Sequence, residues 1–211
     1  MSNFNELIAD NNLLECAVVD PAFEVDRLLR EAKTRGWKIT TILVTHTHHD
    51  HIDGVADMVK ATGARVYVGA GEVETLKRAA PMADIVGLEG GEEIAIGGLT
   101  IEALPTPGHT VAGTSYIVEG NVFTGDTLFI GGCGRTDFPG GDAPTLWRSL
   151  QRLAALPEET RVYPGHDYGQ TPTSTIGWEK SANPYLLCKS EEEFVALRTG
   201  KNAPRPQKRA K

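Results

Sequence analysis

The chain has 211 residues, of which 40% are hydrophobic and 23% charged, so it can bury a core and lacks the composition of a disordered protein. Its formal charge of −7 argues against nucleic acid as the main partner, because a phosphate-binding surface needs a basic excess. The three cysteines are far apart and in no paired spacing, which argues against a disulfide framework.

The ends of the chain set further expectations. The first ten residues carry neither the basic nor the apolar part of a secretory signal, and the apolar runs along the chain are too short to span a membrane. We therefore expect a cytoplasmic protein without a membrane partner, present as a monomer or a small homo-oligomer. Residues 1–200 are expected to form one domain, and the basic segment 201–211 a disordered tail.

The first half of the chain alternates patterns typical of helices and strands. Four apolar residues from Val25 to Ala32 repeat at the spacing of an amphipathic helix. The β-branched run Ile39–Val44 then predicts a buried strand, which ends abruptly in the polar segment 45–54. Beyond this segment we expect, in order, a short helix from Val55 to Gly63, a strand over Arg65–Val68 and a helix over Glu72–Ala79.

The second half has mostly β character, followed by helices. Short strands separated by Gly-Gly and Gly-Asn turns are expected at Glu93–Ile96, Leu99–Leu104, Thr114–Val118 and Val122–Thr124. After the Gly-rich loop 131–141, Asp142 is a candidate N-cap for an amphipathic helix. A last strand at Arg161–Tyr163 and a helix capped by Ser190 and Glu193 complete a pattern that favours a two-sheet core with helices outside.

All six histidines lie in three short segments, and each segment follows a strand-like run. The segments are HTHHDH with His46, His48, His49, Asp50 and His51, PGHT with His109, and PGHD with His166. A fourth segment, FTGDTLF, places Asp126 after another strand-like run. Imidazole and carboxylate groups are ligands that zinc, iron and manganese ions accept. Histidines gathered in turns beside aspartate therefore predict a metal site.

Spacing assigns the residues of the first segment to different places. One residue separates His46 from His48 at the end of a strand, so their imidazoles can converge on one point. Asp50 and His51, further round the turn, can face a second point nearby. His49 is expected to point away from its neighbours, either exposed or behind a ligand.

The HxHxDH segment, followed by His109, Asp126 and His166 in this order, resembles the signature of the metallo-β-lactamase superfamily. The resemblance covers nearly the whole chain and implies an α/β fold, an αββα sandwich of two mixed sheets flanked by helices, with the metals at one edge of the sheets. It implies one ion held by His46, His48 and His109, a second held by Asp50, His51 and His166, and Asp126 bridging both. Two divalent ions are expected, zinc first, with iron or manganese as alternatives. Only about twenty residues precede the first helix, so the family's opening edge strand is expected to be short or absent.

Residues outside the ligand set indicate which branch of the superfamily the chain resembles most. The bridging position is Asp126, where the best-known β-lactamase subclass uses cysteine, and the charge of −7 does not suit an RNA-processing nuclease. The stretches GCGRTDFPGGD from Gly132 and YPGHDYG from Tyr163 resemble the glyoxalase II group and the related persulfide dioxygenases. Both groups act on derivatives of glutathione or a similar thiol. By this resemblance Tyr168 contacts the thiol carrier, and Arg135 holds the site loop or meets a substrate carboxylate.

Two reactions compete on these residues. In the hydrolase, the resemblance implies a metal-bridging hydroxide that attacks a thioester carbonyl, with Asp50 and Asp126 as the catalytic residues that orient it. In the dioxygenase, His46, His109 and Asp126 hold a single Fe(II) ion and leave positions open for O₂ and glutathione persulfide. The GCGRTDF stretch favours the dioxygenase, whereas HHDHID at 48–53 departs from its pattern. We expect the thioester hydrolase, with the dioxygenase as the alternative and a non-catalytic metal-binding module as the third hypothesis.

Overall fold

The computed structural model describes residues 3–201, 203 and 204, so most of the tail expected at 201–211 lies outside the described residues. Within the described part, a five-stranded sheet has the order β1-β2-β3-β4-β5. Its strands are β1 (Glu6–Asp10), β2 (Glu15–Val19), β3 (Lys38–Leu43), β4 (Arg65–Gly69) and β5 (Ile85–Leu88). β1 and β2 form an antiparallel hairpin, and β2 to β5 run parallel. This half is therefore built from βα units added to a hairpin.

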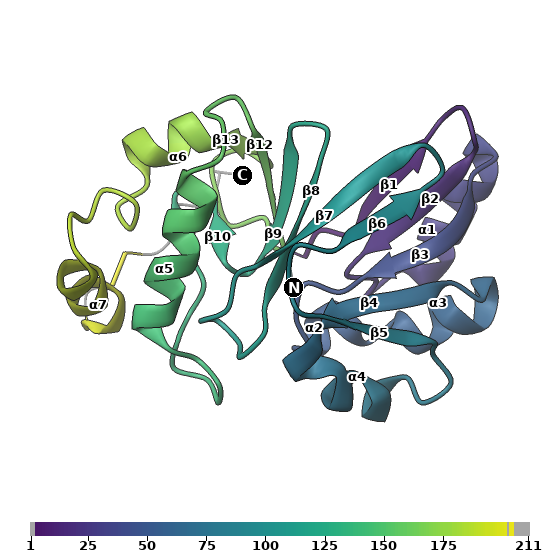
Figure 1. Cartoon of the computed structure of the whole chain (residues 1–211), viewed down its shortest axis with the longest axis horizontal. Coiled ribbons are helices and arrows are strands. Elements are labelled where there is room, and N and C mark those ends of the chain that lie inside the picture. Colours follow the sequence, from purple (N-terminus) through teal and green to yellow (C-terminus); the bar gives the residue numbers. More distant parts are fainter. Residues whose placement is uncertain (1–2, 202, 205–211) are drawn as a thin grey trace.

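A second, six-stranded sheet has the order β13-β12-β9-β8-β7-β6, and its strands β12, β9 and β8 lie to the left of the first sheet in Figure 1. Its strands are β6 (Glu93–Ile96), β7 (Leu99–Pro105), β8 (Thr114–Val118), β9 (Asn121–Gly125), β12 (Arg161–Pro164) and β13 (Ser174–Thr175). Only β9 and β12 pair in parallel. A short pair, β10 (Leu128–Phe129) with β11 (Gly132–Cys133), lies beyond β9.

Helices cover the outer face of each sheet (Figure 1). The first sheet carries α1 (Val25–Arg35), α2 (His49–Ile52), α3 (Val55–Thr62), the 3₁₀ turn η1 (Ala70–Glu72) and α4 (Val73–Ala79). The second carries α5 (Ala143–Ala154), α6 (Ile176–Ala182) and α7 (Glu191–Thr199). The expected caps of α5 and α7 are confirmed: Asp142 accepts a hydrogen bond from the Thr145 amide at 2.8 Å, and Ser190 accepts one from the Glu193 amide at 3.2 Å.

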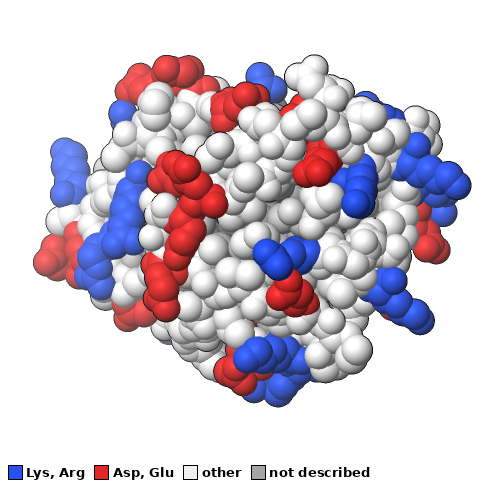
Figure 2. All heavy atoms as spheres, turned by 45° about the vertical axis from the view of Figure 1, so that its right-hand side comes forward, with Lys and Arg blue, Asp and Glu red and all other residues white. Residues whose placement is uncertain are grey.

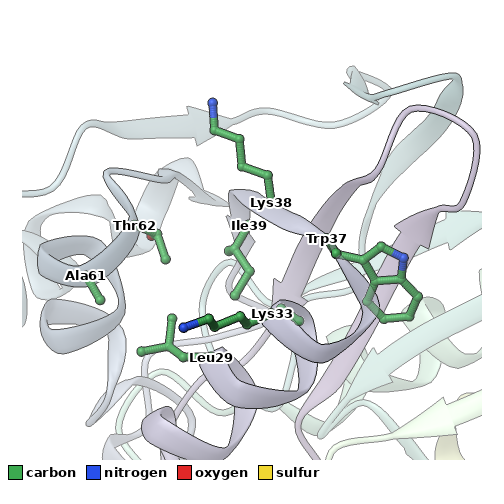
Figure 3. A pocket seen from close by; sticks show the side chains of 9 residues that line it. Leu29, Lys33, Trp37, Lys38, Ile39, Ala61 and Thr62 are labelled. Carbon is green, nitrogen blue, oxygen red and sulfur yellow. The ribbon is translucent and has the colours of Figure 1, made fainter.

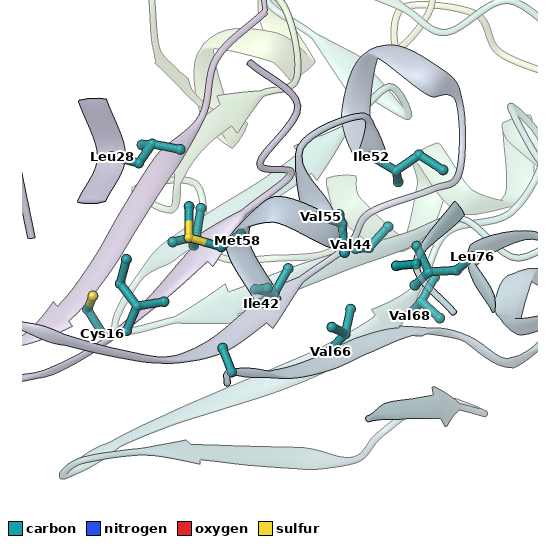
Figure 4. Packing of buried hydrophobic residues seen from close by; sticks show 14 of the residues in the cluster. Cys16, Leu28, Ile42, Val44, Ile52, Val55, Met58, Val66, Val68 and Leu76 are labelled. Carbon is teal, nitrogen blue, oxygen red and sulfur yellow. The ribbon is translucent and has the colours of Figure 1, made fainter. Parts of the chain in front are cut away.

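The core has three layers because neighbouring strand residues point to opposite faces. In β2, Cys16 and Val18 pack against the helices of the first half, in the layer shown in Figure 4, whereas Ala17 and Val19 pack against the second sheet. In the second sheet, Val122 packs against α5 to α7. Strands buried on both faces between outer helices make an αββα sandwich, as the sequence predicted.

The expectation of a short or absent opening strand is wrong. The β1–β2 hairpin is complete, and its turn is closed by Asp10, whose Oδ1 accepts hydrogen bonds from the amides of Asn12 at 2.7 Å and Leu13 at 3.3 Å. Leu14 then adopts a left-handed conformation with φ 57° to return the chain. The continuous apolar run of β2 lacks the polar alternation of a half-buried strand, because both of its faces are buried.

Acidic and basic side chains occur together on the face drawn in Figure 2, where basic groups lie beside an acidic column left of centre. Among the described residues, no helix combines the length and the apolar character that a membrane crossing requires.

Candidate metal centre

The predicted site residues all follow the carboxyl ends of strands. β7 and β9 run in the same direction because each pairs antiparallel with β8, and β12 pairs parallel with β9. The loops after these three strands therefore leave the second sheet at one edge. They carry His109, Asp126 and His166, and the loop after β3 of the first sheet brings the HTHHDH segment to the same edge.

The first triad of donors is His46, His48 and His109, whose ligand atoms all lie within 4.8 Å of one another. His46 and His109 are buried, and His48 is half-buried at the mouth of the site. The Nδ1 atom of His48 lies 3.0 Å from Nε2 of His109. Nδ1 of His109 donates to the carbonyl oxygen of Arg135 at 2.6 Å, which leaves the lone pair on Nε2 and aims it at the other two rings.

The second triad is Asp50, His51 and His166, again with ligand atoms within 4.8 Å of one another. Asp50 and His51 lie in the helical turn α2, directly after His48 at its N-cap. The Nε2 atoms of His51 and His166 are 3.3 Å apart, and Nε2 of His166 lies 3.6 Å from Oδ2 of Asp50. A turn of helix thus directs the second half of the HTHHDH segment to a different point from the first half.

Asp126 lies between the two triads. Its carboxylate oxygens are 3.6 Å from Nε2 of His109 on one side, and 3.4 Å and 3.3 Å from the Nε2 atoms of His51 and His166 on the other. Of all the site residues, it is therefore the one whose carboxylate approaches members of both triads. This is the geometry of a ligand shared by two cations.

The donor set fits divalent cations on the structure's own evidence. Nε2 of His46 and Oδ1 of Asp126 are buried and have no hydrogen-bond partner, although buried polar atoms are nearly always paired. Imidazole nitrogens facing each other at 3.0–3.3 Å repel unless a proton or a cation lies between them. Neutral nitrogen and carboxylate oxygen in a buried cluster are typical ligands of zinc, iron and manganese.

Protonation states support the same interpretation. Burial lowers the pKa of His46 well below its ordinary value, and the neighbouring His51 lowers it further. The pKa of His48 is lowered by burial and by His109. Burial opposes the charge on Asp126, yet His51, His166 and His46 together outweigh it, so that the pKa of Asp126 lies well below its ordinary value. These shifts favour the neutral form of the two histidines and the ionised form of the carboxylate, which are the forms that bind a metal ion.

Asp20, which the sequence analysis missed, orients His51 from behind. Its Oδ2 accepts a hydrogen bond from Nδ1 of His51 at 2.8 Å, and its two oxygens accept bonds from the amide and hydroxyl of Thr45 at 2.7 and 2.6 Å. Burial favours the neutral ring of His51, but Asp126 and Asp20 outweigh it and raise its pKa well above the ordinary value. The two carboxylates therefore stabilise a positive charge at this point, which a bound cation supplies.

The N-terminal segment also reaches the second triad. Nδ2 of Asn3 donates to the carbonyl of Asp50 at 2.7 Å and to its carboxylate at 3.3 Å, and the Phe4 amide donates to Gly165 at 2.9 Å. Asn3 also forms an isolated bridge with His166. No motif of the sequence pointed to this contact, because its residues are separated by 47 or more positions.

Two glycines of the PGH turns are needed for the site to close. Gly108 has φ 123°, and a Cβ there would lie 2.2 Å from the backbone nitrogen of Leu146. A Cβ on Gly165 would lie 2.6 Å from Oδ1 of Asp126 and 2.8 Å from Cε1 of His51. The absence of a side chain thus lets two ligand loops approach each other.

Arg135 and Tyr168, the expected substrate-binding residues, lie at the rim. Arg135 is exposed, its guanidinium pairs with Asp137 at 2.6 Å, and it stacks 4.4 Å from the ring of Phe138. Phe138 in turn lies edge-on to His48, with ring centroids 5.1 Å apart. Tyr168 stacks in parallel on His166, with ring centroids 4.6 Å apart. Each residue therefore borders one triad.

Three other features lie outside the donor set. His49 is exposed, as expected, with its Nδ1 3.6 Å from Asp53. Cys133 is buried, and burial raises the pKa of its thiol. A surface pocket of about 420 Å³ between α1, α3 and the start of β3, lined by Leu29, Lys33 and Trp37 among others, lies at the opposite end of β3 from the histidines (Figure 3). Its lining contains none of the predicted site residues.

Comparisons with known proteins agree with this architecture. Residues 12–166 match the metallo-beta-lactamase superfamily model. A probable polyketide biosynthesis zinc-dependent hydrolase, BaeB, of Bacillus velezensis is 32% identical over 202 residues, covering 95% of this chain and 89% of that protein. A hydroxyacylglutathione hydrolase of Pseudomonas entomophila is 42% identical over 187 residues, covering 87% of this chain and 68% of that protein.

Among solved structures, ETHE1 from Myxococcus xanthus superposes with a TM-score of 0.85 at 38% identity, covering 97% of this chain and 88% of that one. The layered sheets, the cluster of histidine and aspartate at their shared edge and the match over residues 12–166 have one explanation. The chain belongs to the metallo-β-lactamase superfamily, whose members bind metal ions.

Proposed function

We propose that the chain is a metal-dependent hydrolase that cleaves a thioester of glutathione or a similar thiol. The observation that carries the proposal is the pair of donor triads with Asp126 between them. Three histidines on one side and an aspartate with two histidines on the other match two divalent ions, for which zinc is our first choice and iron or manganese the alternatives. The hydroxyacylglutathione hydrolase relative, of which the chain covers 68%, supports this substrate class.

When bound, the ions would supply a hydroxide at neutral pH and polarise the thioester carbonyl. The residues of the chain orient the reactants. Asp126 is half-buried, and its buried, unpaired Oδ1 is positioned to accept a hydrogen bond from the attacking water. Asp50 is the second catalytic residue, and although burial opposes its charge, His51 and the Asn3 amide lower its pKa and keep it an acceptor.

The rim supplies contacts for the thiol carrier. Tyr168 lies against His166 and Phe129, so a carrier bound over the second triad would touch its ring. Arg135 is positioned at the other end, above Phe138 and near the first triad. Asp137 pairs with Nε and Nη2 of Arg135, so Arg135 braces the loop. Its exposed guanidinium can also meet a substrate carboxylate.

A persulfide dioxygenase is the second candidate. The GCGRTDF stretch, which resembles this group, forms the wall of the first triad: the Arg135 carbonyl orients His109, and Phe138 contacts His48. In this reading His46, His109 and Asp126 hold one Fe(II) ion, and the second triad stays empty of metal. The substrate would again be a small thiol derivative, glutathione persulfide.

Metal analysis and two assays on one preparation separate the candidates. Two zinc ions per chain with turnover of S-lactoylglutathione would support the hydrolase. One iron per chain with oxygen uptake on glutathione persulfide, and no thioester cleavage, would overturn it in favour of the dioxygenase. His51→Ala sharpens the test, since it should abolish most two-metal hydrolysis but largely spare a single-iron reaction. A preparation that binds metal and turns over neither substrate would support the non-catalytic module.

A further inference from the structure

A buried carboxylate behind the first triad has no place in the ligand set. Glu72, at the end of the 3₁₀ turn after β4, is only 3% exposed. Its Oε2 accepts hydrogen bonds from the amide and the hydroxyl of Thr47, at 2.6 and 2.5 Å, and its Oε1 accepts a bond from the hydroxyl of Thr110. Among the described residues, no lysine or arginine forms an ion pair with it.

The two threonines belong to different ligand loops. Thr47 lies between His46 and His48 in the loop after β3, and Thr110 follows His109 in the loop after β7. One carboxylate therefore bonds to both segments that carry the first triad, and these segments come from the two different sheets. It bonds to no segment that carries His166 or Asp126 in the described hydrogen bonds.

A buried carboxylate is costly unless strong hydrogen bonds compensate it. Glu72 receives three, two of them from one residue in the middle of the HTH sequence. Hydrogen bonds donated to a charged acceptor are short and directional, so they fix the backbone between His46 and His48 more tightly than bonds to a neutral acceptor would. The packing role alone could be filled by an apolar side chain without a buried charge.

The second triad is braced by different groups. Asp20 bonds to His51, and Asn3 bonds to Asp50. None of the Glu72 bonds reaches these residues. Asp20 also bonds to Thr45, whose hydroxyl lies 3.1 Å from Nδ1 of His46, so Asp20 supports residues of both triads. The Glu72 bonds reach only the segments of the first triad, which makes its contribution to that triad measurable.

We propose that Glu72 is a positioning residue that sets the metal affinity of the His46–His48–His109 triad without being a ligand. The inference depends on one part of the proposed function, namely that this triad binds a metal ion. Groups that orient metal ligands from behind typically change metal affinity by 10–100-fold when they are removed. The same range is expected for Glu72.

The test is a zinc titration of metal-free protein against a chromophoric chelator, for wild type, Glu72→Ala and Glu72→Gln. Glu72→Ala should weaken one of the two zinc ions by about 10–100-fold and leave the other within about twofold. Glu72→Gln should lose less, because the amide oxygen still accepts from Thr47. The matched control is Glu74→Gln on α4, an exposed carboxylate paired with Lys77, which should change neither ion.

Two single-bond variants keep the test informative if Glu72→Ala does not fold. Thr110→Val removes the bond to the His109 loop, and Thr47→Val removes one of the two bonds to the His46 loop. Each should weaken the same ion as Glu72→Gln does, with an unfolding midpoint of the metal-free protein close to wild type. Zinc affinities of the folded variants equal to wild type, or an equal loss at both sites, would overturn the inference.

The outcome is independent of the reaction. If wild type binds a single iron and cleaves no thioester, the proposed function fails, yet Glu72→Ala should still weaken that iron, because His46 and His109 belong to its ligand set. If wild type cleaves thioesters with two ions and Glu72→Ala binds both as tightly, the inference fails by itself.

Discussion

At the scale of single residues, the ligand rings of His109 and His51 are oriented by the group that binds their other ring nitrogen. Nδ1 of His109 faces a backbone carbonyl and Nδ1 of His51 faces the Asp20 carboxylate, so both rings present Nε2 to the centre. A carbonyl can only accept, whereas a carboxylate can be replaced by an amide that donates. Replacing Asp20 by asparagine should therefore change which ring nitrogen of His51 carries the proton.

Asp20→Asn should weaken metal binding at the second triad by about 10–100-fold. The asparagine oxygen can still accept from the Thr45 amide, but its NH₂ group then faces Nδ1 of His51 and favours the tautomer with the proton on Nε2. A zinc titration measures the loss, and Asp53→Asn, an exposed site beside His49, is the control. Weakening of the first triad instead would contradict the assignment of Asp20.

Glu6 adds a pH dependence to stability. Burial and, to a smaller extent, the nearby Asp20 raise its pKa from 4.5 to about 8, although His51 opposes the rise. The folded state then binds a proton more tightly than the unfolded state between pH 4.5 and 8. The free energy of unfolding therefore falls as the pH rises through this window, and the loss is complete above 8.

Glu6→Gln removes this titration. Thermal melts of metal-free wild type and Glu6→Gln at pH 5 and pH 8.5 should show a difference in Tm that grows by about 8–16 °C toward high pH, the variant being the more stable at pH 8.5. Glu93→Gln, on the exposed edge strand β6, should show no such growth. A constant difference between Glu6→Gln and wild type across this range would mean that Glu6 titrates normally.

The residue scale also shows what the sequence can and cannot predict. The seven residues that form the two triads and their bridge follow from short motifs, because neighbours in HTHHDH remain neighbours in the fold. Asp20 and Glu72 lie 31 and 25 residues from the groups they bond, within an ordinary strand end and an ordinary helix start. Only the tertiary structure brings them to the site.

At the scale of elements, the strands predicted from alternation or β-branched runs begin and end within one or two residues of the observed strands. The capped helices agree equally well. The β1–β2 hairpin was missed because β2 is buried on both faces and its signal is a short apolar run. β5 and α6 were also missed: α6 follows only Thr175 as a cap, in a segment with Gly and Pro on either side. Short elements that depend on tertiary packing carry little local signal.

The C-terminal helices grip the loop that carries Arg135. Nε of Arg198 in α7 donates to the Gly134 carbonyl at 2.9 Å, Glu179 in α6 accepts from the Gly131 amide at 3.0 Å, and Asn183 donates to Gly132 at 2.9 Å. Since the carbonyl of the following Arg135 orients His109, these helices support the first triad from outside. α7 is thus connected to the centre through this loop.

Arg198→Met should loosen this loop while keeping the side chain's apolar stem. One charge-assisted hydrogen bond is worth about 1.5–3 kcal/mol, so amide hydrogen exchange over residues 132–138 should accelerate by about tenfold or more. Arg148→Met is the control, because Arg148 joins α5 to α7 through Glu191 without touching the loop. Acceleration of equal size in the control would show that loss of contact to α7 in general, and not the Gly134 bond, is responsible.

At the scale of the whole molecule, the centre joins the two sheets at their shared edge. The loop after β3 belongs to the first sheet, and the loops after β7, β9 and β12 belong to the second. Direct links between the halves exist near the centre, such as the Thr114 amide to the Thr45 carbonyl at 2.9 Å and the Tyr116 hydroxyl to the Val44 carbonyl at 2.8 Å. The ligand side chains bring nitrogen lone pairs and carboxylates from both halves face to face. Their mutual repulsion is relieved only when a proton or a cation lies between them.

Removal of the metal should therefore lower the stability of the whole chain but loosen the structure locally. A site filled at 100 times its dissociation constant contributes about 2.7 kcal/mol, and for a chain of this size this corresponds to about 5–11 °C in Tm per site. Differential scanning calorimetry with zinc and with a chelator measures the shift.

In hydrogen exchange of the same samples, the amides of the four ligand loops should lose protection together, because each loop is held by the ions that the others bind. The amides of α1 should keep their protection, because Leu28 and Ala32 pack in a cluster that contains no ligand. A Tm that does not respond to zinc would contradict the metal centre, and a loss of protection spread evenly over α1 and the loops would contradict its role as a local link between the sheets.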